Sequence, residues 1–139
     1  MRDIEMMRER LSAAEGVGNT LAAGWDAFEL VQAVASESAG LTPGMFPAFM
    51  FAAASAAEGR DAVGFAPSMP ATPGQPACLT RPDSADAHQI ADDLAGLVTA
   101  LGLRLHAAAD QAVDPGDRRA CEDAGREADR IRHLLGPDR

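Results

Sequence analysis

The chain has 139 residues and a mass of 14.4 kDa, so we expect residues 1–139 to form a single domain. Its apolar fraction of 47% suffices for a packed core and excludes a wholly disordered chain. The net charge of −9 argues against binding to nucleic-acid backbones or anionic membranes, and no apolar run approaches the roughly 18 residues of a membrane span.

The N-terminal region predicts a short helix over residues 3–15. Its apolar positions share one helical face: Ile4, Met7, Leu11 and Ala14. Gly16 and Gly18 would each cost about 1 kcal/mol inside a helix relative to Ala, so we expect a break there. The first ten residues contain no apolar segment, so we expect no secretory signal and a cytoplasmic location.

A second helix is predicted over residues 20–39, ending before Gly40. Its apolar surface is wide, which indicates either a central place in a bundle or a dimer interface. A third helix is predicted over residues 46–58, with Pro47 in its first turn. No charged side chain occurs from Met45 to Ala57, so we expect this helix to be buried on all sides.

Residues 59–82 interrupt the helical pattern and are rich in proline. Pro67, Pro70, Pro73 and Pro76 recur at every third residue, a spacing that would align them along one edge of a polyproline II helix. Such a strip could be a ligand for a proline-reading groove. We favour the simpler interpretation, a stiff connector between two helical halves.

Two further helices are predicted over residues 84–113 and 115–135, with Asp83 or Ser84 capping the first of them. Asp114 as N-cap and Pro115 as first helical residue separate them, so they should form an antiparallel hairpin. The first helix has an apolar stripe at three- and four-residue steps: Ile90, Leu94, Leu97, Leu101, Leu105, Ala108 and Ala112. The facing stripe is smaller: Cys121, Ala124, Ala128, Ile131 and Leu135.

These elements predict an all-α fold. We expect a four-helix bundle-like domain with a short extra N-terminal helix and a Pro-rich central connector. The Ala-rich composition favours helices over strands, and the absence of Lys is typical of a GC-rich bacterial genome.

The large apolar side chains gather on the second and third helices. Trp25, Phe28, Phe46, Phe49 and Met50 are therefore candidates for an apolar ligand pocket or a dimer interface, although the bundle core alone could require them.

Each of three His-Asp pairs could supply two metal ligands from one face of its own helix. They are His88 with Asp92, His106 with Asp110, and Asp129 with His133, each four residues apart. A site needs at least one more ligand, so a solvated helix surface is the favoured interpretation. Cys78 and Cys121 lack metal-ligand spacing, and we expect both to be reduced.

No nucleophile elbow, Gly-rich phosphate loop or zinc-protease motif occurs in the chain. We therefore expect no catalytic residues and no cofactor, and favour a non-enzymatic interaction or regulatory protein acting as a homodimer. One alternative is a small-molecule-binding protein or enzyme with an apolar pocket near Trp25. A weaker alternative is a metal-binding bundle that uses the His-Asp pairs.

Overall fold

Five α-helices account for most of the described chain. The computed structural model describes residues 2–70 and 86–136. Its helices are α1 (Arg2–Ala13), α2 (Gly16–Ser38), α3 (Phe46–Gly64), α4 (Ala87–Gln111) and α5 (Pro115–Leu135), with a 3₁₀ turn, η1 (Pro43–Met45), before α3. No strand occurs in these residues, which confirms the predicted all-α class. None of their helices is long and apolar enough to cross a membrane.

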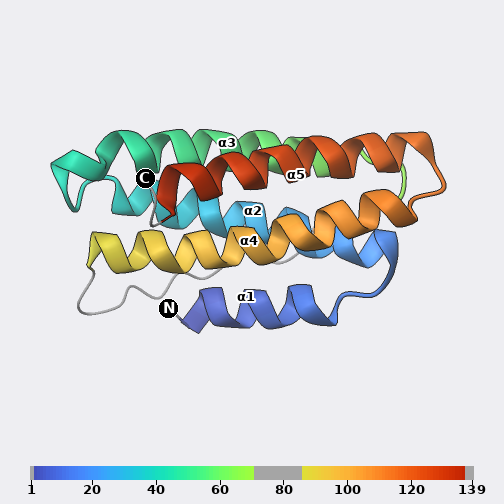
Figure 1. Ribbon diagram of the computed structural model, residues 1–139, viewed down its shortest axis with the longest axis horizontal. Coiled ribbons are helices and arrows are strands. Elements are labelled where there is room, and N and C mark those ends of the chain that lie inside the picture. The colour runs from blue at the N-terminus through green and yellow to red at the C-terminus, as the bar shows by residue number, and fades with distance from the viewer. Residues whose placement is uncertain (1, 71–85, 137–139) are drawn as a thin grey trace.

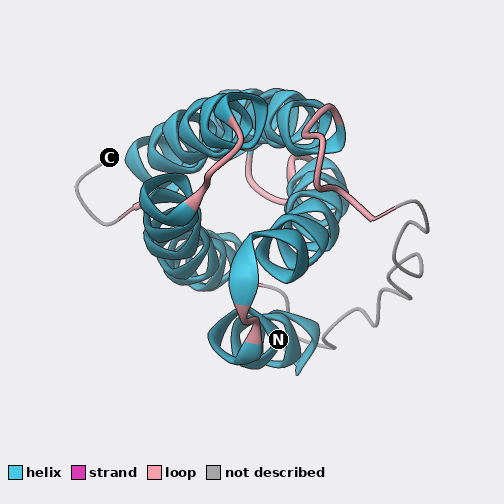
Figure 2. Ribbon diagram, turned by 90° about the vertical axis from the view of Figure 1, so that its right-hand side faces the viewer, coloured by secondary structure: helices cyan, strands magenta, loops and turns pink. Residues whose placement is uncertain are grey.

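Four helices form a ring around the core. Viewed along the bundle, the order around the ring is α2, α3, α5 and α4, and α1 lies outside it (Figure 2). Each helix of the ring runs antiparallel to both of its neighbours (Figure 1). α1 packs against α2 and α4 and covers the seam between them.

The α4–α5 hairpin follows the predicted pattern. The four leucines of the α4 stripe, Leu94, Leu97, Leu101 and Leu105, are fully buried. Across from them, α5 buries mainly small side chains, which lets the two helices pack closely. Asp114 caps α5 by accepting hydrogen bonds from the backbone N–H of Gly116 (2.7 Å) and of Asp117. Residues 84 and 85, at the predicted start of α4, lie outside the described residues; Asp86 caps this helix through the N–H of His88.

The predicted break between the first two helices is shorter than expected. α2 begins at Gly16 rather than at residue 20, and Gly16 has a positive φ of 81° that allows the sharp turn from α1. Gly18 lies inside the first turn of α2, where a Cβ would come 3.4 Å from the backbone oxygen of Ser68. This is an ordinary contact distance, so Gly18 lies beside Ser68 without being required there, and it does not end a helix.

The wide apolar surface of α2 is covered within the chain. α2 contacts α1, α3 and α4, so it takes the central place that was one of its two predicted roles. An ion pair between Arg10 of α1 and the buried Asp26 of α2 holds α1 against α2. Arg104 of α4 also donates a hydrogen bond to the backbone oxygen of Ala14.

α3 continues to Gly64, so the predicted end at residue 58 is wrong. A Cβ at Gly59 would lie 2.5 Å from two ring atoms of the fully buried Phe28, so only glycine lets α2 and α3 approach this closely. The next residue, Arg60, donates hydrogen bonds from its guanidinium to the side-chain oxygens of Glu29 (2.6 Å) and Gln32 (2.8 Å) on α2. These contacts with α2 hold the polar last turns of α3 in a helix.

Only the start of the predicted connector lies in the described chain. The buried carboxylate of Asp117 accepts hydrogen bonds from the backbone N–H (2.9 Å) and the hydroxyl of Ser68, which fastens this segment to the first turn of α5. Pro67 packs beside Gly116. Pro73, Pro76 and Cys78 lie outside the described residues.

Candidate functional site

The outer face of α3 is an exposed apolar surface. Phe46, Met50 and Phe51 are 51%, 43% and 63% exposed, and Ala54 continues the same face. The expectation that this helix is buried on all sides is therefore wrong. The ring geometry supplies the reason, because α3 packs against α2 and α5, and no helix within residues 2–70 and 86–136 lies on its outer side (Figure 2). We call Phe46, Met50, Phe51 and Ala54 the α3 outer face.

The structure divides the five predicted apolar residues between two environments. Phe28 and Phe49 are fully buried in the core, whereas Phe46 and Met50 lie on the α3 outer face. Trp25 is partly buried and packs beside Gly64, where a Cβ would lie 3.7 Å from the indole nitrogen.

Phe51 is the large side chain of this face that the predicted set omitted. Phe51 comes five residues after Phe46, which is about 140° further around the helix, so the two rings lie at opposite edges of the exposed surface, with Met50 and Ala54 between them. The helical spacing alone could not separate exposed from buried positions in a segment where nearly all side chains are apolar.

Acidic side chains border the α3 outer face toward the C-terminal end of the helix. Glu58 and Asp61 are exposed there. Glu58 lies 3.8 Å from Arg130 of α5, which also contacts Glu127 at 2.9 Å. Burial raises the pKa of Glu127, and the neighbouring Arg130 lowers it by a smaller amount. The surface is therefore apolar at its centre and acidic at one end.

The three histidines do not assemble a metal site in the described chain. His106 of α4 lies 3.3 Å from the carboxylate of Asp129 on α5, so its partner is an acid from another helix and not Asp110. His133 donates from Nδ1 to the backbone oxygen of Asp129 at 2.8 Å, so it does not form the predicted pair with the carboxylate. His88 and Asp92 lie on the first two turns of α4. No group of three or more His, Cys, Asp or Glu residues in residues 2–70 and 86–136 could hold a metal ion.

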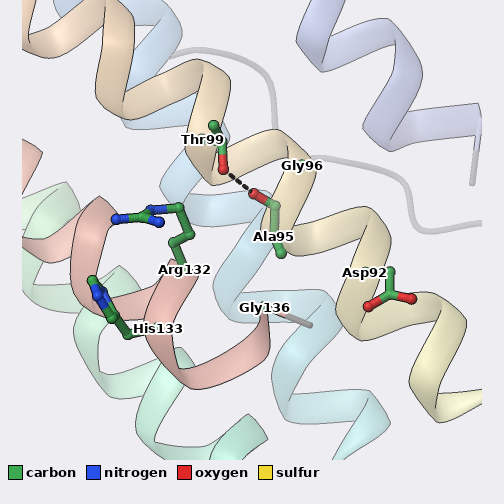
Figure 3. Close-up of a pocket in the computed structure, with 7 residues that line it drawn as sticks. All are labelled: Asp92, Ala95, Gly96, Thr99, Arg132, His133 and Gly136. Carbon is green, nitrogen blue, oxygen red and sulfur yellow. Dashed lines mark hydrogen bonds between the residues drawn. The ribbon is translucent and has the colours of Figure 1, made fainter. Parts of the chain in front are cut away.

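An open pocket of about 570 Å³ lies between α4 and the end of α5 (Figure 3). Its lining residues are Asp92, Ala95, Gly96, Thr99, Arg132, His133 and Gly136. Figure 3 shows Asp92 on one side of the opening and Arg132 and His133 on the other. Of these seven, only Asp92 and His133 were singled out from the sequence, and as metal ligands. Sequence spacing gave no signal for the rest, because they come from two helices that meet only in the folded chain.

Cys121 is a buried thiol and not a reactive nucleophile. Desolvation is the main cause that raises its pKa to about 11, and the nearby carboxylates of Asp117 and Glu122 add to it. The thiolate is the reactive form of cysteine, so this position is unsuited to covalent catalysis.

This environment predicts alkaline destabilisation through Cys121. The pKa is higher in the folded chain than its usual value near 9, so the stabilising effect is complete below about pH 9 and is lost as the pH rises toward 11. The chain has neither Lys nor Tyr, which leaves few other groups that titrate in this range. In a Cys78→Ser background, thiolate absorbance should show a midpoint near 11 when folded and near 9 in urea. A folded midpoint near 9 would contradict the buried environment.

Comparison of the chain with protein-family models, with curated proteins and with solved structures gave no match. The function must therefore be inferred from the surfaces described above.

Proposed function

We propose that this protein is a non-enzymatic interaction or regulatory protein that acts as a homodimer, and that the α3 outer face is its interface. The observation that supports this proposal is the exposure of Phe46, Met50 and Phe51 on the outer half of one helix. Large apolar side chains exposed as a contiguous group are typical of interaction sites.

A second copy of the chain suits this surface for two reasons. First, the surface carries no charge over residues 46–57, so an identical uncharged surface can cover it without burying an unpaired charge. Second, Ala54 and Ala57 are small, so an identical helix could approach closely about a two-fold axis, where the same residues from each copy meet.

The size of the surface fits the centre of a dimer interface. From their exposed fractions, Phe46, Met50 and Phe51 offer roughly 300 Å² of apolar area per copy. Two copies would bury about 600 Å² of it, against a total of about 1,600 Å² for a standard interface. Neighbouring residues of α3 and its flanking helices would then supply the rim.

Phe51→Asp tests this proposal. The variant replaces the most exposed ring of the proposed interface by a charge without touching the core, so we expect its dimer dissociation constant to rise at least thirtyfold, or about 2 kcal/mol. Sedimentation equilibrium measures the constant, and circular dichroism checks that the helices are retained.

Leu103→Asp is the matched control. Leu103 is 68% exposed on α4, which lies diagonally across the ring from α3. This variant adds the same charge on another face, so its association should equal that of the wild type. Equal weakening by both variants, or none by Phe51→Asp, would contradict the proposed interface.

A further inference from the structure

The charge on the exposed side of α3 is confined to one end of the helix. Residues 46–57 carry no charge, whereas Glu58 and Asp61 follow directly and are 69% and 64% exposed. The uncharged stretch is therefore centred between Phe51 and Ala52, and Glu58 lies about 10 Å from that centre along the helix. This asymmetry decides how two copies of the α3 outer face can pair.

The acidic end of α3 keeps a negative charge in spite of its arginines. Each arginine there lies closer to an acid outside α3 than to the acid on α3. Arg130 Nη1, for example, lies 2.9 Å from Glu127 and 3.8 Å from Glu58. Four carboxylates thus share two arginines, which leaves four minus two, or two, negative charges: Glu29, Glu58, Asp61 and Glu127 with Arg60 and Arg130. Two copies of this end placed side by side would repel each other.

The opposite end of α3 has no acid to balance its helix dipole. Within residues 2–70, no side chain caps the start of α3, and its first turn holds no acidic residue. By contrast, α4 and α5 are capped by Asp86 and Asp114. The positive end of the α3 dipole would therefore be stabilised by a carboxylate from outside its own helix.

Antiparallel pairing of two α3 helices suits both ends. A two-fold axis perpendicular to α3, level with Phe51 and Ala52, brings residues 46–57 of one copy against the same residues of the other. Glu58 of each copy then lies level with the first turn of α3 in the other copy, and the two Glu58 residues lie roughly 20 Å apart along the helix. Parallel pairing would cover the same apolar residues but would place Glu58 beside Glu58.

The sizes of the exposed side chains agree with this arrangement. In the antiparallel register, Met50 lies opposite Ala54 of the partner subunit, and Pro47 lies opposite Ala57 of the partner subunit. Each larger side chain therefore meets a small one, which allows close packing. In a parallel pair, Met50 would meet Met50 and Ala54 would meet Ala54, so the larger residues would hold the small ones apart.

We infer that two copies of this chain pair with their α3 helices antiparallel, with Glu58 of each copy beside the start of α3 in the other. The inference rests on the proposed function, because it gives the orientation of the same interface. Recognition of a second copy then combines a central apolar contact with a carboxylate at a helix start on each side.

Disulfide trapping tests the orientation. Pro47→Cys and Ala57→Cys are made separately in the Cys78→Ser background, in which the remaining Cys121 is buried. The two full chains are mixed at a concentration where the protein is dimeric, oxidised mildly and separated by mass. The mixed disulfide should exceed either self-linked product by at least about tenfold. In the antiparallel pair each position lies more than about 13 Å from its own copy, beyond the roughly 7 Å that a disulfide spans.

Glu58→Gln gives a second readout, in which the two orientations predict opposite signs. In the antiparallel pair it removes a carboxylate from each helix start, so we expect the dimer dissociation constant to rise about threefold or more. In a parallel pair it would relieve repulsion, and the constant would fall. Glu122→Gln is the matched control, because Glu122 is exposed on α5 and the change removes the same charge from the acidic chain. The effect of Glu58→Gln is measured relative to this control.

Failure of the orientation is distinguishable from failure of the dimer. A dimer by mass that gives mainly self-linked products, or no disulfide at all, would overturn the antiparallel arrangement and leave the homodimer standing. A Glu58→Gln dimer tighter than the Glu122→Gln dimer would do the same. A chain that stays monomeric before oxidation would overturn the homodimer and the orientation together.

Discussion

Replacing Gly59 by Ala should lower the free energy of unfolding by about 2 kcal/mol, although Ala is the better helix former. The new Cβ would lie 2.5 Å from Phe28 Cε1 and Cζ, and Phe28 is fully buried, so the ring has no free space to move into. Overpacking of this kind costs about 1–3 kcal/mol or more and exceeds the gain of about 1 kcal/mol in helix propensity. Urea denaturation followed by circular dichroism measures the difference.

Gly64→Ala provides the control in the same helix. A Cβ there would lie 3.7 Å from the indole of Trp25, an ordinary contact distance. The variant should be as stable as the wild type or slightly more stable. If both variants were equally stable, the close packing of α2 on α3 at Gly59 would be contradicted.

Replacing Phe28 by Ala should have the largest effect, a loss of about 3–5 kcal/mol, because it leaves a cavity at a fully buried position. In this background Gly59→Ala should cost much less, since the ring that it would strike is gone. A double-mutant cycle on the two positions should therefore show a clear coupling energy.

Phe51→Ala is the matched truncation on the surface. Phe51 is 63% exposed on the α3 outer face, so at concentrations where the protein is monomeric the change should stay within about 0.5 kcal/mol. A cost similar to that of Phe28→Ala would contradict the assignment of these two rings to surface and core.

The elements with regular spacing and clear end signals could be predicted from the sequence. Asp114 and Pro115 mark the start of α5, and the three- and four-residue steps from Leu94 to Leu105 identify the buried face of α4. These signals are local, so they do not depend on which helices become neighbours.

The end of α3 could not be predicted because tertiary contacts determine it. Glu58, Gly59 and Arg60 have the composition of a loop, yet Gly59 allows contact with Phe28 and Arg60 binds Glu29 of α2. The contacts with α2 outweigh the weak local preference for a break.

The candidate sites depend even more on tertiary contacts that local sequence signals do not reveal. Helical spacing groups Phe46, Phe49 and Met50 together, but only the ring order of the helices decides that Phe49 lies in the core and the others outside. His106 contacts the carboxylate of Asp129 and not that of Asp110, which is closer in sequence, because α4 and α5 are antiparallel neighbours. The pocket with Arg132 depends on this packing too.

Light scattering at two protein concentrations tests the proposed homodimer most directly. If the α3 outer face mediates self-association, the mass should approach twice 14.4 kDa at the higher concentration and fall toward 14.4 kDa on dilution. A mass of 14.4 kDa at both concentrations would contradict the dimer and leave the α3 outer face without its proposed partner.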